Sequence, residues 1–180
     1  MILGANHVAI SVPDMERALE FYSDVLGFEK VLDNGWPAGT EVADEILAVK
    51  GTSARCCQVR TTNLIIELFE FGARNPAKQN PDRPVIDHGF THLALAVTDL
   101  DAEYARLCAA GMRFHSAPVE VAPGIRTVYG RDPFGNVIEL EDSKGRVAPH
   151  DPISATELPQ LTTEFDSGAE RSSTMTASPQ

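Results

Sequence analysis

Two glutamates stand inside apolar, strand-like segments of the chain. Glu67 lies within "NLIIELFEF", residues 63–71, and Glu139 lies within "NVIELED", residues 136–142. A buried carboxylate without a partner is costly, so such a group is normally paired, protonated or bound to a metal ion. The sequence must therefore supply partners for both glutamates.

A histidine occupies the same place in each of two repeated segments. The segment "NHVAISVPDM" aligns with "THLALAVTDL", which puts His7 at the position of His92. In the same way "IIEL" aligns with "VIEL", which puts Glu67 at the position of Glu139. An internal repeat of this kind predicts two copies of one structural unit. We expect each copy to carry a histidine in its first strand and a glutamate in its last.

Strand alternation predicts where these side chains point. Successive residues of a strand face opposite sides, so His7 shares its face with alanine and serine, and His92 shares its face with two alanines. The large apolar neighbours take the other face, where they can pack on a helix. The small-residue faces therefore leave room for a recess. If each half curls around its small-residue face, the four side chains converge in one cavity. Either the two halves of one chain or halves of two chains could close that cavity.

Two imidazoles and two carboxylates are a ligand set for a divalent transition metal. Imidazole favours Zn, Ni, Co or Fe, and carboxylates also allow Mn. A bound cation would neutralise the buried glutamates as well. We therefore expect one divalent metal ion per site, bound by His7, Glu67, His92 and Glu139.

The elements around these residues repeat in the same order. Residues 6–12 and 90–97 have the pattern of strands, and Asp14 and Asp99 are predicted N-caps of the helices that follow. Gly27 and Gly111 are expected to end those helices. The remaining expected elements are strands at 28–32, 54–61, 63–71, 113–117, 125–131 and 136–142, a short helix at 41–49, and a turn at 132–136.

The expected fold is α+β, with two βαβββ modules forming curved mixed sheets around a metal cavity. Module one is assigned to residues 4–72 and module two to residues 91–144. A proline-containing linker, 73–90, joins them, and together they form one domain, 1–144. Residues 145–180 are rich in Pro, Ser and Thr, which predicts a tail without its own core.

The composition of the chain excludes several classes of binding partner. The net charge of -11 argues against nucleic acid, because phosphate binding needs clustered Lys and Arg. No apolar run approaches the length of a membrane helix, and no signal segment is evident, so we expect a cytoplasmic protein without a membrane partner. The three cysteines include no Cys-x-x-Cys pair, so neither a disulfide framework nor a zinc ribbon is expected.

These segments resemble the vicinal oxygen chelate superfamily over about residues 4–142. The superfamily includes glyoxalase I, methylmalonyl-CoA epimerase, extradiol dioxygenases, and the fosfomycin and bleomycin resistance proteins. The resemblance implies paired βαβββ modules around a metal ion and a homodimer. The His-Glu-His-Glu set is similar to that of metal-dependent glyoxalase I. It implies a metal-dependent lyase or isomerase acting on a small vicinal-oxygen substrate, with Glu139 as first candidate for the catalytic base and Glu67 as second.

Alternatives within the superfamily remain open. An Fe(II)-dependent ring-cleaving dioxygenase uses two histidines and one carboxylate, whereas this chain has a fourth ligand. A non-catalytic drug- or metabolite-binding resistance protein typically lacks the complete ligand set. The epimerase uses a second acidic base on the strand before the first glutamate ligand. Here that strand, 53–61, has no carboxylate, which argues against a two-base epimerisation.

Several further residues are candidates for the substrate pocket. The segment 36–50 is longer than a minimal module needs, and we expect it to cover the mouth of the cavity. The candidate substrate-binding residues are Trp36, Arg60, Phe69, Arg126 and Tyr129.

Overall fold

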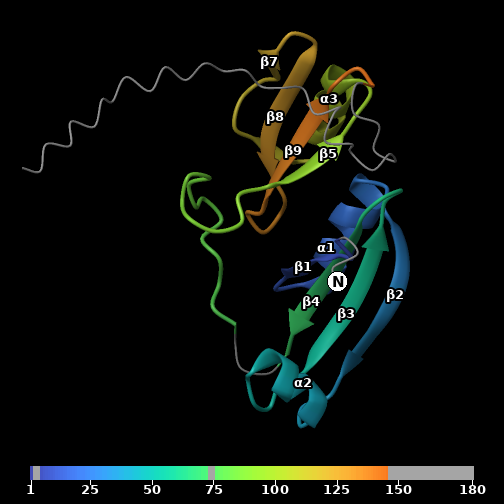
Figure 1. Cartoon of the computed structure of the whole chain (residues 1–180), viewed down its shortest axis with the longest axis vertical. Coiled ribbons are helices and arrows are strands. Elements are labelled where there is room, and N and C mark those ends of the chain that lie inside the picture. The colour runs from blue at the N-terminus through green and yellow to red at the C-terminus, as the bar shows by residue number, and fades with distance from the viewer. Residues whose placement is uncertain (2–4, 73–75, 146–180) are drawn as a thin grey trace, which may run out of the picture.

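The computed structural model describes residues 1, 5–72 and 76–145. Its two modules have separate sheets, which Figure 1 shows one above the other. In module one the strand order is β1-β4-β3-β2, with β1 parallel to β4 and the other pairs antiparallel. Its elements are β1 (Val8–Ser11), α1 (Met15–Leu19), η1 (Glu20–Val25), β2 (Glu29–Trp36), α2 (Glu41–Leu47), β3 (Ala54–Arg60) and β4 (Ile65–Phe71).

Module two repeats this topology. Its strand order is β5-β9-β8-β6, with β5 parallel to β9 and with β7 added to β8. Its elements are β5 (Leu93–Ala96), α3 (Leu100–Ala109), β6 (Arg113–Phe114), β7 (Val119–Ala122), β8 (Ile125–Arg131) and β9 (Val137–Asp142). The expected α+β architecture of two mixed sheets is confirmed.

Corresponding residues of the two modules have corresponding partners in the two sheets. In module one Ala9 of β1 lies opposite Glu67 of β4. In module two Ala94 of β5 lies opposite Glu139 of β9. Each alanine stands two residues after a histidine, so each histidine lies on the same side of its sheet as the glutamate. The alternation predicted from the sequence therefore holds in both modules.

Both predicted N-caps form. The Asp14 carboxylate accepts a hydrogen bond from Arg17 N at 3.0 Å, and the Asp99 carboxylate accepts one from Ala102 N at 3.1 Å. The helix after Asp14 differs from the expected α-helix, because it turns into the π-helix η1 after Leu19. The apolar residues of this segment recur at α-helical spacing, and π-helical turns are rare, so the pattern does not indicate the change.

Other boundaries also differ from expectation. The strand β2 runs on through Trp36, where a loop was expected, because β3 pairs with it along its whole length. The short helix covers only residues 41–47 of the expected 41–49. Of the strand expected at 113–117, only two residues pair, and β7 was not expected at all.

The two modules share one buried core, to which α1, η1 and α3 contribute. At the seam, Tyr22 donates its hydroxyl proton to the carboxylate of Asp132 at 2.8 Å. Asp132 is buried and also accepts hydrogen bonds from the backbone of Phe134 and Asn136, which shapes the predicted turn at 132–136. This carboxylate therefore ties the π-helix of module one to the β8–β9 turn of module two.

The second part of the linker is anchored on module two. Arg131 donates a hydrogen bond to the carbonyl of Arg83 at 2.8 Å, and Gln79 donates one to Asn136 at 3.2 Å. Figure 1 shows this segment running beside the second sheet. Residues 146–180, nearly all of the predicted tail, lie outside the described residues. Within the described part of the chain, no helix is long and apolar enough to cross a membrane.

Candidate metal centre

Half-site one consists of His7 and Glu67. His7 immediately precedes β1, and Glu67 lies in the middle of the neighbouring strand β4. The Nε2 atom of His7 is 3.4 Å from Oε2 of Glu67. The parallel pairing of β1 with β4 therefore brings the first two predicted metal ligands together.

Half-site two consists of His92 and Glu139. His92 immediately precedes β5, Glu139 lies in β9, and Nε2 of His92 is 2.9 Å from Oε2 of Glu139. Tyr129 lies opposite Glu139 on β8, and its ring centre is 4.8 Å from that of His92. This ring contact restricts the orientation of the imidazole, so the second pair is also held in place.

The other nitrogen of each imidazole already has a partner. Nδ1 of His7 is 2.7 Å from Oδ1 of Asn6, and Nδ1 of His92 is 3.0 Å from the hydroxyl of Thr91. An amide oxygen only accepts hydrogen bonds, so the contact with Asn6 puts the proton of a neutral His7 ring on Nδ1. The Nε2 atom then presents a lone pair to Glu67. This is the tautomer that binds a metal ion through Nε2.

The other oxygen of each glutamate is also occupied. Oε1 of Glu67 accepts hydrogen bonds from Gln58 Nε2 at 2.9 Å and from the Cys56 thiol at 3.4 Å. Oε1 of Glu139 accepts one from the Thr127 hydroxyl at 2.5 Å. In both half-sites only Oε2 faces the histidine. Partners of this kind orient the ligands of known metal sites.

The spacing within each pair fits a bound cation. Two adjacent ligands that are each about 2.1 Å from one metal ion lie roughly 3.0–3.4 Å apart. The observed separations between Nε2 and Oε2 are 3.4 and 2.9 Å. In half-site one, two lone pairs face each other, and such an arrangement is favourable only with a cation or a proton between them. The donor set therefore fits a divalent metal ion.

Each half-site is incomplete by itself. Within residues 5–72 and 76–145, no group of three or more His, Cys, Asp or Glu side chains comes close enough to hold a metal ion. The four predicted ligands therefore do not form one group within the described residues of a single chain. The histidine side chains keep 38% and 28% of their surface exposed, against 16% and 12% for the glutamates. Each pair thus faces outward through its imidazole.

The aromatic candidates lie on the same face as Glu67. Phe69 is two residues further along β4, and its ring contacts those of Trp36 and Phe71 at centroid distances of 5.7 and 5.5 Å. The indole of Trp36 is fixed by a hydrogen bond to Thr52, which Asp44 of α2 also holds. Half-site one therefore has an aromatic wall beside it, supported from the segment 36–50.

The two arginine candidates are placed differently from each other. Arg60 follows Gln58 on the same face of β3 and pairs with Glu29 at 2.6 Å. Arg126 pairs with Asp101 of α3 at 2.7 Å, on the opposite face of β8 from Thr127 and Tyr129. Arg126 is therefore left out of the site proposed below, whereas Tyr129 is retained because it contacts His92.

Sequence reasoning did not single out the residues that hold the glutamates: Cys56, Gln58 and Thr127. Strand parity could have found them, because each lies on the face of its own ligand. It also missed Glu141, which shares a face of β9 with Glu139. Burial, and then the charge of Glu139, raises the pKa of Glu141.

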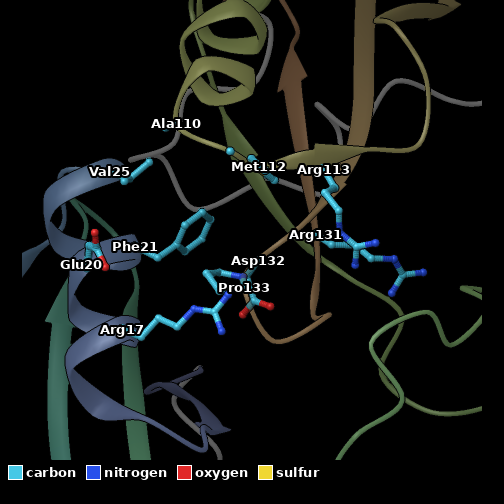
Figure 2. Close-up of a pocket in the computed structure, with 11 residues that line it drawn as sticks. Arg17, Glu20, Phe21, Val25, Ala110, Met112, Arg113, Arg131, Asp132 and Pro133 are labelled. Atoms are coloured by element: carbon cyan, nitrogen blue, oxygen red, sulfur yellow. The ribbon is translucent and has the colours of Figure 1, made fainter.

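Three cavities lie elsewhere in the described part of the chain. One, of about 320 Å³, opens at the seam, where Arg17 and Phe21 of module one face Pro133 of module two (Figure 2). The second, of about 630 Å³, follows the edge of β1 beneath the linker. The third, of about 510 Å³, lies between the linker and Arg131. None of the four predicted ligands lines any of these cavities, so none encloses the candidate metal centre.

The fold and the repeated His–Glu pairs agree with a known family. A family model described as glyoxalase/bleomycin resistance protein/dioxygenase superfamily matches residues 4–140. The chain belongs to this superfamily, as its sequence resemblance predicted.

Two curated relatives carry names that describe reactions. A 2-epi-5-epi-valiolone epimerase from an Actinomyces species is 35% identical over 148 residues, which is 77% of this chain and 78% of the relative. A probable lactoylglutathione lyase from a Synechocystis species is 27% identical over 135 residues, or 74% and 91% of the two chains. The chain thus has one relative named as an epimerase and one named as a probable lyase.

Solved structures share the fold. A glyoxalase family protein from Bacillus cereus superposes with a TM-score of 0.72 at 21% identity, covering 79% of this chain and 95% of that one. The fosfomycin resistance protein FosX from Listeria monocytogenes, solved with Mn(II) and sulfate, gives a TM-score of 0.52 at 17% identity, with 79% and 93% covered. Both likenesses show that this chain has the same fold as these proteins.

Proposed function

We propose that this protein is a metal-dependent isomerase or lyase that moves a proton at a carbon atom beside a carbonyl or hydroxyl group. The observation that carries the proposal is the repeated pair of His Nε2 and Glu Oε2 atoms, 3.4 and 2.9 Å apart. His7, Glu67, His92 and Glu139 would hold the ion. When bound, a divalent ion supplies Lewis acidity that stabilises negative charge on a substrate oxygen.

We infer that a second copy of the chain completes the site. Half-site one of one copy would meet half-site two of the other, and two-fold symmetry would then create two identical sites per dimer. Both histidines stand at the start of edge strands, because β1 and β5 each end the strand order of their sheet. The exposed imidazoles support the same arrangement.

We assign a separate role in the reaction to each residue near the proposed metal site. Glu139 is our first choice for the group that takes the proton from carbon, and Glu67 is the second. Tyr129 orients His92 through its ring contact. Phe69 and Trp36 would shield the substrate from water beside half-site one. Arg60, at the end of the same strand face, could contact a negatively charged part of the substrate.

The relatives favour proton transfer over oxygen chemistry. One is named as an epimerase and one as a probable lyase. The fourth candidate ligand also departs from the set of two histidines and one carboxylate expected of an Fe(II)-dependent dioxygenase. The strand β3 carries no carboxylate on the face of Glu67. A second base for epimerisation would therefore have to come from another strand, and Glu141 on β9 lies on the required face.

The test begins with metal content. The purified protein is stripped with a chelator, reconstituted separately with Zn, Ni, Co, Mn and Fe(II), and analysed by mass spectrometry for bound metal. The expected result is about one ion per chain with at least one of these metals. Failure of every metal to bind would overturn the proposal.

The reaction class is tested with the metal-loaded protein in D₂O. 2-Epi-5-epi-valiolone and lactoylglutathione are offered separately, and deuterium incorporation at carbon is followed by NMR. We expect metal-dependent exchange with a compound of one of these two classes under anaerobic conditions. Turnover that requires oxygen would instead favour the dioxygenase, and tight binding without any exchange would favour a binding protein.

A further inference from the structure

The two half-sites hold their glutamates by different donors. Glu67 lies opposite Gln58, whose amide donates to Oε1 at 2.9 Å. Glu139 lies opposite Tyr129 instead, and the ring of this residue contacts His92 rather than the carboxylate. The donor to Glu139 comes from Thr127, two residues earlier on β8. Module two therefore depends on a hydroxyl where module one has an amide.

The Thr127 hydroxyl has two acceptors within reach. It is 2.5 Å from Oε1 of Glu139 and 3.0 Å from the carbonyl oxygen of Leu140. A hydroxyl group has one proton and can rotate, so it can serve only one of these acceptors at a time. Oε1 of Glu67 accepts hydrogen bonds from two side chains, the Gln58 amide and the Cys56 thiol. Oε1 of Glu139 relies on the Thr127 hydroxyl, which Leu140 also attracts.

The hydrogen bond from Thr127 to Glu139 is shielded from water. Thr127 is 8% exposed and the side chain of Glu139 is 12% exposed. Hydrogen bonds shielded from water in this way are stronger, and a buried carboxylate that loses its donor is destabilised. Among the described residues, the Thr127 hydroxyl is the donor to Oε1 of Glu139. If the hydroxyl turns to Leu140, this oxygen loses its donor.

We propose that Thr127 is a positioning residue for Glu139. Its hydroxyl holds Oε1 of Glu139, so that Oε2 faces His92. This inference rests on the proposed metal site and extends it to a residue that does not itself touch the metal.

The experiment compares Thr127→Val and Thr127→Ser with the unmodified protein. The affinity for the metal that the unmodified dimer retains is measured by competition with a chromophoric chelator, and turnover is measured at saturating metal. Removing a group that orients a metal ligand typically costs 10–100-fold in affinity or activity. We therefore expect Thr127→Val to raise the metal dissociation constant at least about tenfold and to lower turnover similarly. Thr127→Ser, which keeps the hydroxyl, should stay within about threefold on both scales.

A matched control uses the other face of the same strand. Asp101→Asn removes the ion pair with Arg126, which lies on the outer face of β8, and should leave metal affinity unchanged. If Thr127→Val binds metal as tightly as the unmodified protein, or if Thr127→Ser loses as much as Thr127→Val, the positioning role is wrong. If the unmodified protein binds no metal, the proposed function itself fails. The two failures are therefore distinguishable.

Discussion

At the residue scale, the site is defined by which atom of each side chain is left free. Asn6 and Thr91 occupy Nδ1 of the two histidines. The donors on β3 and β8 occupy Oε1 of the two glutamates. The remaining Nε2 and Oε2 atoms face each other within each module. A metal site built this way depends on neighbouring polar groups as much as on its four ligands.

The exchange of Glu139 for glutamine tests the catalytic assignment. Glu139→Gln keeps the shape of the side chain and removes its ability to accept a proton, so turnover in the D₂O assay should fall about 10²–10⁴-fold. The control is Glu70→Gln, because Glu70 of β4 has the opposite parity to Glu67 and lies across from Arg55. Equal turnover in Glu139→Gln and the unmodified protein would remove Glu139 from the role of base.

Cysteine reactivity tests the environment of Glu67. Burial, and then the charge of Glu67, raises the pKa of the Cys56 thiol to about 12, and burial raises that of Cys57 to about 11. Alkylation requires the thiolate, so neither thiol should react with iodoacetamide at pH 8 in the folded protein. Cys108 is exposed and should react. Peptide mass spectrometry checks this, and rapid labelling of Cys56 before unfolding would contradict the placement.

At the scale of elements, the sequence predicted most of what the site needs. The repeat in the strands that carry His7 and Glu67, together with the caps Asp14 and Asp99, gave the order and the faces of the main elements. It did not give the π-helix after Leu19, because the apolar residues there recur at α-helical spacing. It also did not give the continuation of β2 through Trp36, because pairing with β3 overrides the local turn signals of Gly and Pro.

The seam between the modules yields a prediction about stability. Tyr22 is almost fully buried, and its hydroxyl donates to the buried carboxylate of Asp132 at 2.8 Å. A hydrogen bond to a charged group contributes about 1.5–3 kcal/mol, so Tyr22→Phe should lower the free energy of unfolding by about that amount in urea titration. The control Tyr104→Phe, at a half-buried position on α3, should cost less. Equal losses would mean that the seam bond contributes little.

At the scale of the whole molecule, one chain holds two half-sites rather than one site. Sequence reasoning proposed the four residues as a repeated set and left open whether one chain or two would bring them together. No pattern within a single chain specifies contacts between two copies. The separation of the half-sites in the described residues is what makes the dimer part of the proposal.

A complementation experiment tests the central proposal, a metal site shared between two copies, most directly. One variant combines His7→Ala with Glu67→Ala, and the other combines His92→Ala with Glu139→Ala; each should bind no metal alone. A heterodimer of the two, purified through different affinity tags, would contain one intact composite site. The account predicts about one metal ion per heterodimer and about half the unmodified activity, from the pairing of one intact half-site per copy. A heterodimer without metal or activity would contradict a site shared between chains.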